Sequence, residues 1–143
     1  MSQLWIQLAY GAVLIVSATI IQTVSIGMVM AMRAHLARKL GTAGIVRLSL
    51  LIGAVALWLM VGQMLGVWLW AWTLVWLGAF ADLEPSLYFS LAAYTTLGFG
   101  DVLAPDEWRI LGALTGANGM LGFGVGTAAL VEFVRGLRSA WAN

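Results

Sequence analysis

The sequence predicts an all-α integral membrane protein, with three transmembrane helices, one short re-entrant helix and an irregular loop after it. Of its 143 residues, 62% are hydrophobic and only 9% are charged, whereas soluble domains carry about 25% charged residues. Three apolar runs are long enough to cross a bilayer, because a crossing helix needs about 20 residues. A fourth run is shorter, which is typical of a segment that enters the membrane and turns back.

Composition excludes several classes of function. The chain has no cysteine and one histidine, so thiolate metal sites, disulfides and histidine clusters are excluded. A net charge of +1 gives no basic surface for nucleic acid. No nucleophile, base and orienting group lie together outside the apolar runs, so we expect no enzyme. The first ten residues lack Lys and Arg, which argues against a cleaved signal peptide.

The first half of the chain predicts two crossings. Residues 1–32 carry no charge and predict an additional N-terminal transmembrane helix. Residues 33–47 hold four basic residues and two glycines, as expected of a cytoplasmic loop. The outer helix follows at 48–72, and 73–84 form an interfacial turret. Tryptophans near the end of this helix predict anchors at the headgroup level: Trp68, Trp70, Trp72 and Trp76.

The second half predicts a short helix, a loop and a final crossing. Pro85 suits the first turn of a helix at 85–95, and the acids Asp82 and Glu84 lie near its positive end. The irregular stretch TLGFGD covers 96–101, and the last transmembrane helix covers 109–135.

The distribution of charge predicts the orientation of the crossings. Six of the seven basic residues fall on one side of these segments, and only Arg109 falls on the other. Because cytoplasmic loops are rich in Lys and Arg, we expect a multi-pass protein of the plasma (inner) membrane, with the N-terminus outside and the C-terminus in the cytoplasm. The six residues are Arg33, Arg38, Lys39, Arg47, Arg135 and Arg138.

The loop at 96–101 predicts a cavity for cations. Irregular backbone is tolerated at membrane depth only where protein buries it or water reaches it. Gly98 and Gly100 can adopt positive φ, so an alternating backbone could turn successive carbonyl oxygens to one side. The alternative is that both glycines only permit close helix packing.

The same loop resembles the TVGYGD selectivity filter of tetrameric potassium channels, with Leu97 for Val and Phe99 for Tyr. The last helix, NGMLGFGVGTAAL, looks like the inner helix of small bacterial members of that family. The resemblance implies a potassium-channel pore domain at 48–138, a homotetramer in the lipid bilayer, and bound K⁺ as the only cofactor. By this resemblance, K⁺ would be held by the Thr96 hydroxyl and by the backbone carbonyls of Thr96, Leu97, Gly98 and Phe99. Gly100 and Asp101 would shape the outer mouth of the filter.

The resemblance also assigns roles in the last helix. Gly119 falls at the hinge position, although close packing is an equal explanation. Four residues fall where the family lines its cavity and inner gate: Met120, Phe123, Thr127 and Val131. Glu132 has two interpretations, a salt bridge to Arg135 or a ring of acids at the gate that attracts cations or senses pH.

Two departures from the family pattern bear on the filter. Phe99 lacks the hydroxyl through which the filter tyrosine bonds to the pore helix, and Ala92 replaces a glutamate that pairs with the filter aspartate in some relatives. We therefore expect Asp101 to bond elsewhere, with Tyr88 as the candidate. The predicted function is a passive, potassium-selective ion channel. The alternatives are a weakly selective monovalent cation channel and a non-conducting subunit of a potassium transport complex.

Overall fold

Three long helices and one short helix make up the part of the chain that the structure describes. The computed structural model describes residues 2–40 and 44–142. Helices α1, α2 and α4 each contain a stretch long and apolar enough to cross a membrane. The predicted all-α fold with three such helices is confirmed. The elements are α1 (Ser2–Leu40), α2 (Ile45–Trp76), α3 (Leu83–Tyr94), the 3₁₀ turn η1 (Asp106–Trp108) and α4 (Arg109–Ala142).

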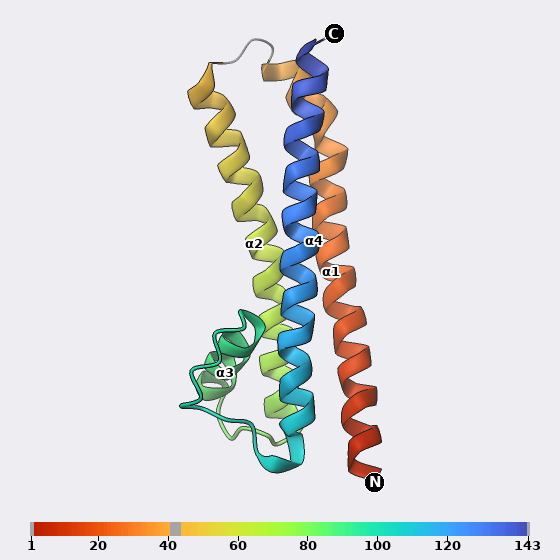
Figure 1. Ribbon diagram of the computed structural model, residues 1–143, viewed down its shortest axis with the longest axis vertical. Coiled ribbons are helices and arrows are strands. Elements are labelled where there is room, and N and C mark those ends of the chain that lie inside the picture. Colours follow the sequence, from red (N-terminus) through yellow and green to blue (C-terminus); the bar gives the residue numbers. More distant parts are fainter. Residues whose placement is uncertain (1, 41–43, 143) are drawn as a thin grey trace.

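The three long helices run side by side along the long axis of the molecule (Figure 1). Helix α3 lies beside α2 at the end that also holds the N-terminus. The end of α1, the start of α2 and the C-terminal end of α4 lie at the opposite end. The loop after α3 and the N-terminus therefore share one end of the bundle.

Helix α1 joins the bundle along a seam with heptad spacing. Its buried positions are separated by three or four residues, which brings them to one face of a helix. Most of them are small or polar, as is common where helices approach closely in membranes. They are Gln7, Gly11, Leu14, Ala18, Gln22, Ser25 and Val29.

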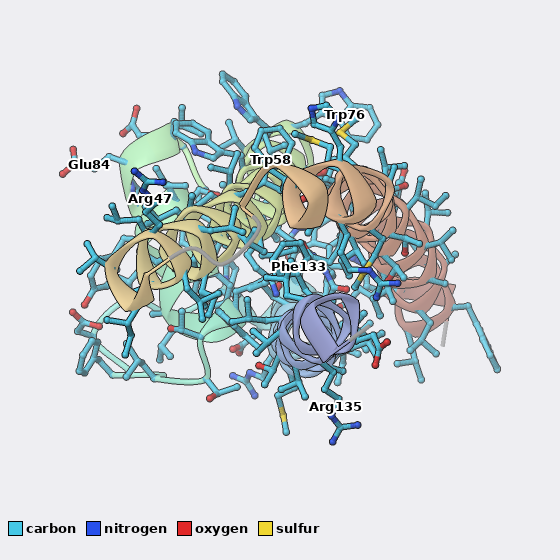
Figure 2. The ribbon with its side chains drawn as sticks, turned by 90° about the horizontal axis from the view of Figure 1, so that it is seen from above. Arg47, Trp58, Trp76, Glu84, Phe133 and Arg135 are labelled. Atoms are coloured by element: carbon cyan, nitrogen blue, oxygen red, sulfur yellow. The ribbon has the colours of Figure 1, made fainter. Side chains whose placement is uncertain are left out.

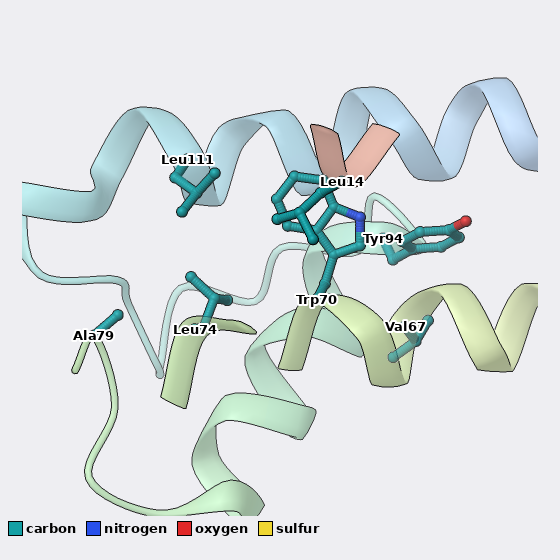
Figure 3. Close-up of a cluster of buried hydrophobic side chains, with 7 residues drawn as sticks. All are labelled: Leu14, Val67, Trp70, Leu74, Ala79, Tyr94 and Leu111. Atoms are coloured by element: carbon teal, nitrogen blue, oxygen red, sulfur yellow. The ribbon is translucent and has the colours of Figure 1, made fainter. Parts of the chain in front are cut away.

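Two apolar clusters hold the helices together. The first surrounds the fully buried Trp70 and takes residues from all four helices, as Figure 3 shows: Leu14, Val67, Trp70, Leu74, Ala79, Tyr94 and Leu111. The second surrounds Phe133, which points into the space between α1, α2 and α4 (Figure 2). The predicted anchoring role of Trp70 is therefore wrong, because its ring lies inside the bundle.

The helices extend further than the sequence predicts. Helix α1 continues to Leu40 and α2 starts at Ile45, so most of the predicted loop at 33–47 is helical, and 41–43 lie outside the described residues. Helix α3 begins two residues early, at Leu83, and α4 continues past 135 to Ala142.

Gly78 sets the end of α2, four residues beyond the predicted end. It has a φ of 74°, and its N–H donates to the carbonyl of Val75. The N–H of Ala79 donates to the carbonyl of Leu74. These two bonds form a Schellman motif, in which a left-handed glycine satisfies the last helical carbonyls. Residues 73–76 of the predicted turret are helical for this reason.

Candidate functional site

Hydrogen bonds at both ends fix α3 to α2. Near its start, the Ser86 hydroxyl donates to the Ala71 carbonyl at 2.8 Å. At its last residue, the Tyr94 hydroxyl donates to Oε1 of Gln63 at 3.2 Å. Ser86 and Tyr94 are both buried, so these bonds lie in surroundings of low dielectric constant, which strengthens them and holds the helix in one position. The chain leaves α3 from a fixed point.

The loop after α3 folds back onto the last turn of the helix. Three of its amides donate to carbonyls of that turn: Thr95 to Leu91 at 3.0 Å, Thr96 to Ala93 at 2.9 Å and Gly98 to Ala92 at 3.1 Å. These carbonyls have no partner within the helix. The loop therefore begins as a cap on α3, and its first residues inherit the position of the helix.

The backbone of the loop alternates between positive and negative φ. Thr96, Gly98 and Gly100 have φ of 62°, 53° and 80°, while Leu97 and Phe99 do not have positive φ. Thr96 is the only non-glycine residue with positive φ in the part of the chain described here. For a β-branched residue this conformation is a genuine outlier, and such strain gathers at functional sites. The alternation lets successive carbonyls face one side, as the sequence suggested for the two glycines.

The side chains of the loop lie on its exposed surface. Leu97 is 62% exposed and Phe99 is 69% exposed. A methyl group added at Gly98 or Gly100 would meet no atom within 4 Å, so both glycines are explained by their positive φ and not by close packing. The packing alternative for these glycines therefore has no contact to support it within the described chain.

Asp101 closes the loop through a bond to α3. The Tyr88 hydroxyl donates to Oδ2 of Asp101 at 2.7 Å, and the Val102 N–H donates to Oδ1 at 3.1 Å. The expected partner of Asp101 is confirmed. The bond from Tyr88 lowers the pKa of Asp101, and the same bond raises the pKa of Tyr88. A charged carboxylate therefore holds the end of the loop against α3.

Gly119 lets α4 approach the end of α3. A methyl group there would lie 2.6 Å from the carbonyl carbon of Tyr94 and 2.9 Å from its Cα, and closer still to its carbonyl oxygen. Helix α4 continues without interruption through this position. The structure therefore gives Gly119 a packing role. One turn later on α4, the Phe123 ring packs against the Tyr94 ring, with the two ring centroids 6.2 Å apart.

The residues of α4 that were predicted to line the cavity and inner gate include three on an exposed face of the helix. Met120 is 67% exposed, Val131 is 46% exposed and Thr127 is also exposed. Their spacing of seven and four residues places them on one side of the helix. Phe123 follows Met120 by three residues and lines one pocket with Thr127, so the four predicted cavity residues lie on the same side of α4.

Glu132 pairs with the first helix and not with Arg135. Its Oε1 lies 3.6 Å from Nη1 of Arg33 on α1. A methyl group at Gly136 would lie 2.6 Å from the guanidinium carbon of Arg33, so this glycine provides the space for the arginine. The predicted pairing within α4 is therefore corrected: the ion pair joins two helices. Arg135 points away from the bundle in Figure 2.

Side chains alone do not form a metal site in the described chain. Among residues 2–40 and 44–142, no three acidic, histidine or cysteine side chains come together. The oxygen atoms able to surround a cation near the loop are backbone carbonyls, the Thr96 hydroxyl and the Asp101 carboxylate. Oxygen ligands of this kind suit hard cations.

Comparison with protein families decides the class. The family described as "Ion channel" matches residues 63–136, which is more than half of the chain. The chain belongs to this ion-channel family. It is a multi-pass membrane protein, and the matched region contains α3, the loop and most of α4. Comparisons with curated proteins and with solved structures found no match.

Three buried polar residues near Tyr94 were not predicted from the sequence. Gln22, Gln63 and Asn118 lie in the middle of apolar segments, and each is buried in the bundle. The sequence does indicate that these residues are buried, because a polar residue within a membrane crossing usually faces the protein interior. Which of them meet, however, follows only from how the helices pack.

Proposed function

We propose that this ion channel is a homotetramer in the plasma membrane that conducts K⁺ passively and selectively through a pore lined by residues 96–100. The observation that carries the proposal is the alternating backbone of the loop, with Thr96, Gly98 and Gly100 in the left-handed region. A strained threonine is costly unless the conformation serves a purpose, and here it allows a row of carbonyl oxygens. Such a row can replace the hydration shell of K⁺.

Four copies are needed to complete this site. One chain supplies one loop, and a single row of oxygens cannot surround an ion. The apolar side chains of Leu97 and Phe99 are exposed in one chain, which is expected of surfaces that neighbouring copies cover. The exposed face of α4 that holds Met120, Thr127 and Val131 would face the central cavity or a neighbouring chain. Native mass spectrometry should find four 15.3-kDa chains in one particle.

The test of selectivity is the reversal potential of purified protein in planar bilayers. We expect the current to reverse near the potassium equilibrium potential, both in a potassium gradient and after exchange of K⁺ for Na⁺. Gly98→Ala should abolish this selectivity, because alanine at a φ of 53° costs about 1–2 kcal/mol and disturbs the alternation.

Gly78→Ala is the matched control. Gly78 has a φ of 74° and, like Gly98, meets no atom within 4 Å of an added methyl group, but it lies at the end of α2. It should strain the backbone equally and leave the reversal potential unchanged. A reversal potential midway between those of the two cations would overturn potassium selectivity in favour of a weakly selective cation channel. No current, with another polypeptide always co-purifying, would favour a non-conducting subunit of a potassium transport complex.

A further inference from the structure

Buried polar side chains from all four helices meet at the C-terminal end of α3. Helix α1 contributes Gln22 and Ser25, α2 contributes Gln63, α3 contributes Tyr94 and α4 contributes Asn118. Gln22 is 4% exposed and Asn118 is 2% exposed. In a membrane protein, polar groups at such positions need partners, because lipid supplies none.

Glycines provide the space that Gln22 occupies. A methyl group at Gly62 on α2 would lie 2.7 Å from Oε1 of Gln22 and 3.1 Å from Oγ of Ser25. A methyl group at Gly126 on α4 would lie 3.3 Å from Nε2 of Gln22. The amide of Gln22 therefore fits between α2 and α4, in a slot that larger residues would close.

Tyr94 occupies a second slot of the same kind. A methyl group at Gly66 on α2 would lie 2.8 Å from the Tyr94 hydroxyl oxygen, and one at Gly122 on α4 would lie 3.2 Å from it. The hydroxyl donates to Gln63 there. Gln63 Nε2 and Gln22 Nε2 both lie near Gly126, at 3.6 and 3.3 Å from an added methyl group, so the two slots are adjacent.

Several polar atoms of this cluster make no hydrogen bond to a described protein group. They are Nε2 and Oε1 of Gln22, Oγ of Ser25 and Nδ2 of Asn118. Leaving such groups unpaired is costly, and in proteins they are normally satisfied by an ordered water molecule. The cluster offers both donors and acceptors, which a water molecule requires.

A small cavity joins two of the residues that need a partner, Gln22 and Asn118. It lies between α1, α3 and α4, is lined by Gln22, Tyr94, Asn118 and Gly122 among others, and has a volume of about 10 Å³ for the centre of a water molecule. That is close to the least volume that holds one water. We propose that the amides of Gln22 and Asn118 hold one ordered water molecule in this cavity.

Through this site, α1 gains a role in the channel. Gln22 is a positioning residue: with the water it supports Tyr94, the last residue of α3, from which the loop begins. The water site itself does not depend on the ion that the pore conducts, whereas its effect on the loop rests on the proposed function.

Water-edited solid-state NMR of the full chain in lipid vesicles tests the site directly. We expect magnetisation to pass from water to the side-chain amides of Gln22 and Asn118 several-fold faster than to the indole N–H of Trp70. Trp70 is the control, because its Nε1 is also buried and unpaired but its residue does not line the cavity. Transfer to Gln22 and Asn118 that is as slow as transfer to Trp70 would overturn the proposal.

A variant tests the positioning role. Gln22→Met keeps the length of the side chain and removes its amide, so the transfer to Asn118 should fall and the ring signals of Tyr94 should move. Gln7→Met is the control on the same face of α1. Gln7 lies 15 residues before Gln22, does not line the cavity, and accepts from the Leu111 N–H at 3.0 Å. Unchanged Asn118 transfer and Tyr94 signals in Gln22→Met, with a native fold, would disprove the role. If the variant does not fold, the measurement on the unchanged chain still decides the water site.

Discussion

At the scale of single residues, hydrogen bonds at its two ends determine the shape of the loop. Thr96 accepts a left-handed backbone that costs about 1–3 kcal/mol in most contexts. The amides of Thr95, Thr96 and Gly98 offset part of this cost by capping α3. At the other end, Asp101 is tied to Tyr88. The loop is thus fixed at both ends by α3, and its middle is free to present carbonyls.

The bond between Tyr88 and Asp101 predicts a measurable titration. It lowers the pKa of Asp101, so Tyr88→Phe should raise that pKa toward its usual value. Because the pKa is lower in the folded state than in the unfolded chain, the bond stabilises the fold above the unfolded pKa. That stabilisation is lost as the pH falls through the folded pKa. Carbon-13 NMR titration of the Asp101 carboxyl measures the change.

Tyr10→Phe is the matched control for this titration. Tyr10 packs its ring against Trp76, 6.3 Å away, and is not bonded to a carboxylate. Removal of the Tyr10 hydroxyl should leave the pKa of Asp101 unchanged. An Asp101 pKa that stays the same in Tyr88→Phe would show that the hydroxyl does not bond to the carboxylate in the membrane.

At the scale of elements, close approach between helices places the site. Helix α4 touches the backbone of α3 at Gly119, and α1 follows α4 with a seam of small and polar residues. Near the C-terminal ends of α1 and α4, the Arg33 and Glu132 side chains are 36% and 59% exposed, so their ion pair is worth only about 0–1 kcal/mol. The apolar clusters and the glycine contacts contribute more than this pair.

Gly119→Ala should destabilise the protein strongly. The added methyl group would overlap the Tyr94 carbonyl, which is backbone and cannot rotate away. Overpacking of this kind typically costs about 1–3 kcal/mol in the free energy of unfolding, and more where the neighbour cannot move. Unfolding of the purified protein in mixed micelles with increasing SDS measures the loss.

Gly53→Ala is the control for the crowded glycine. Gly53 also lies within a long helix, and a methyl group there would meet no atom within 4 Å. Its stability should stay within about 0.5 kcal/mol of the unchanged protein. Equal stability of Gly119→Ala and Gly53→Ala would remove the packing explanation and favour a hinge at Gly119.

At the scale of the whole molecule, the order of the helices places the N-terminus and the loop at one end (Figure 1). Five acids lie in the segments between α2 and α4, at the end of the bundle that holds the loop. Six of the seven basic residues belong to the opposite ends of the three long helices. This asymmetry predicts that the loop faces outward.

Labelling of single cysteines should establish this orientation. The chain has no native cysteine, so Glu107→Cys and Arg135→Cys each provide one reactive site, and both positions are exposed. A membrane-impermeant maleimide added to intact cells should label position 107 and not position 135. The two should become equally reactive after the membrane is opened. Labelling of position 135 alone in intact cells would reverse the proposed topology.

The sequence by itself determined the class of fold and the place of the loop. Apolar length requires helices that cross the membrane, because lipid offers no partner to unpaired backbone groups. Gly98 and Gly100 indicated positive φ, and the substitution of Ala92 indicated a new partner for Asp101. These inferences succeed because each depends on a short stretch of chain.

The tertiary structure alone decided which distant residues meet. Arg33 pairs with Glu132, and Gly119 packs on Tyr94. Trp70 lies inside the bundle, although Trp68 and Trp72 on the same helix are exposed. Apolar residues predominate on every side of these helices, so composition does not distinguish a face that meets lipid from one that meets another helix. Only the packing of α1 against α2 and α4 makes that choice, because it depends on where small residues of separate helices coincide.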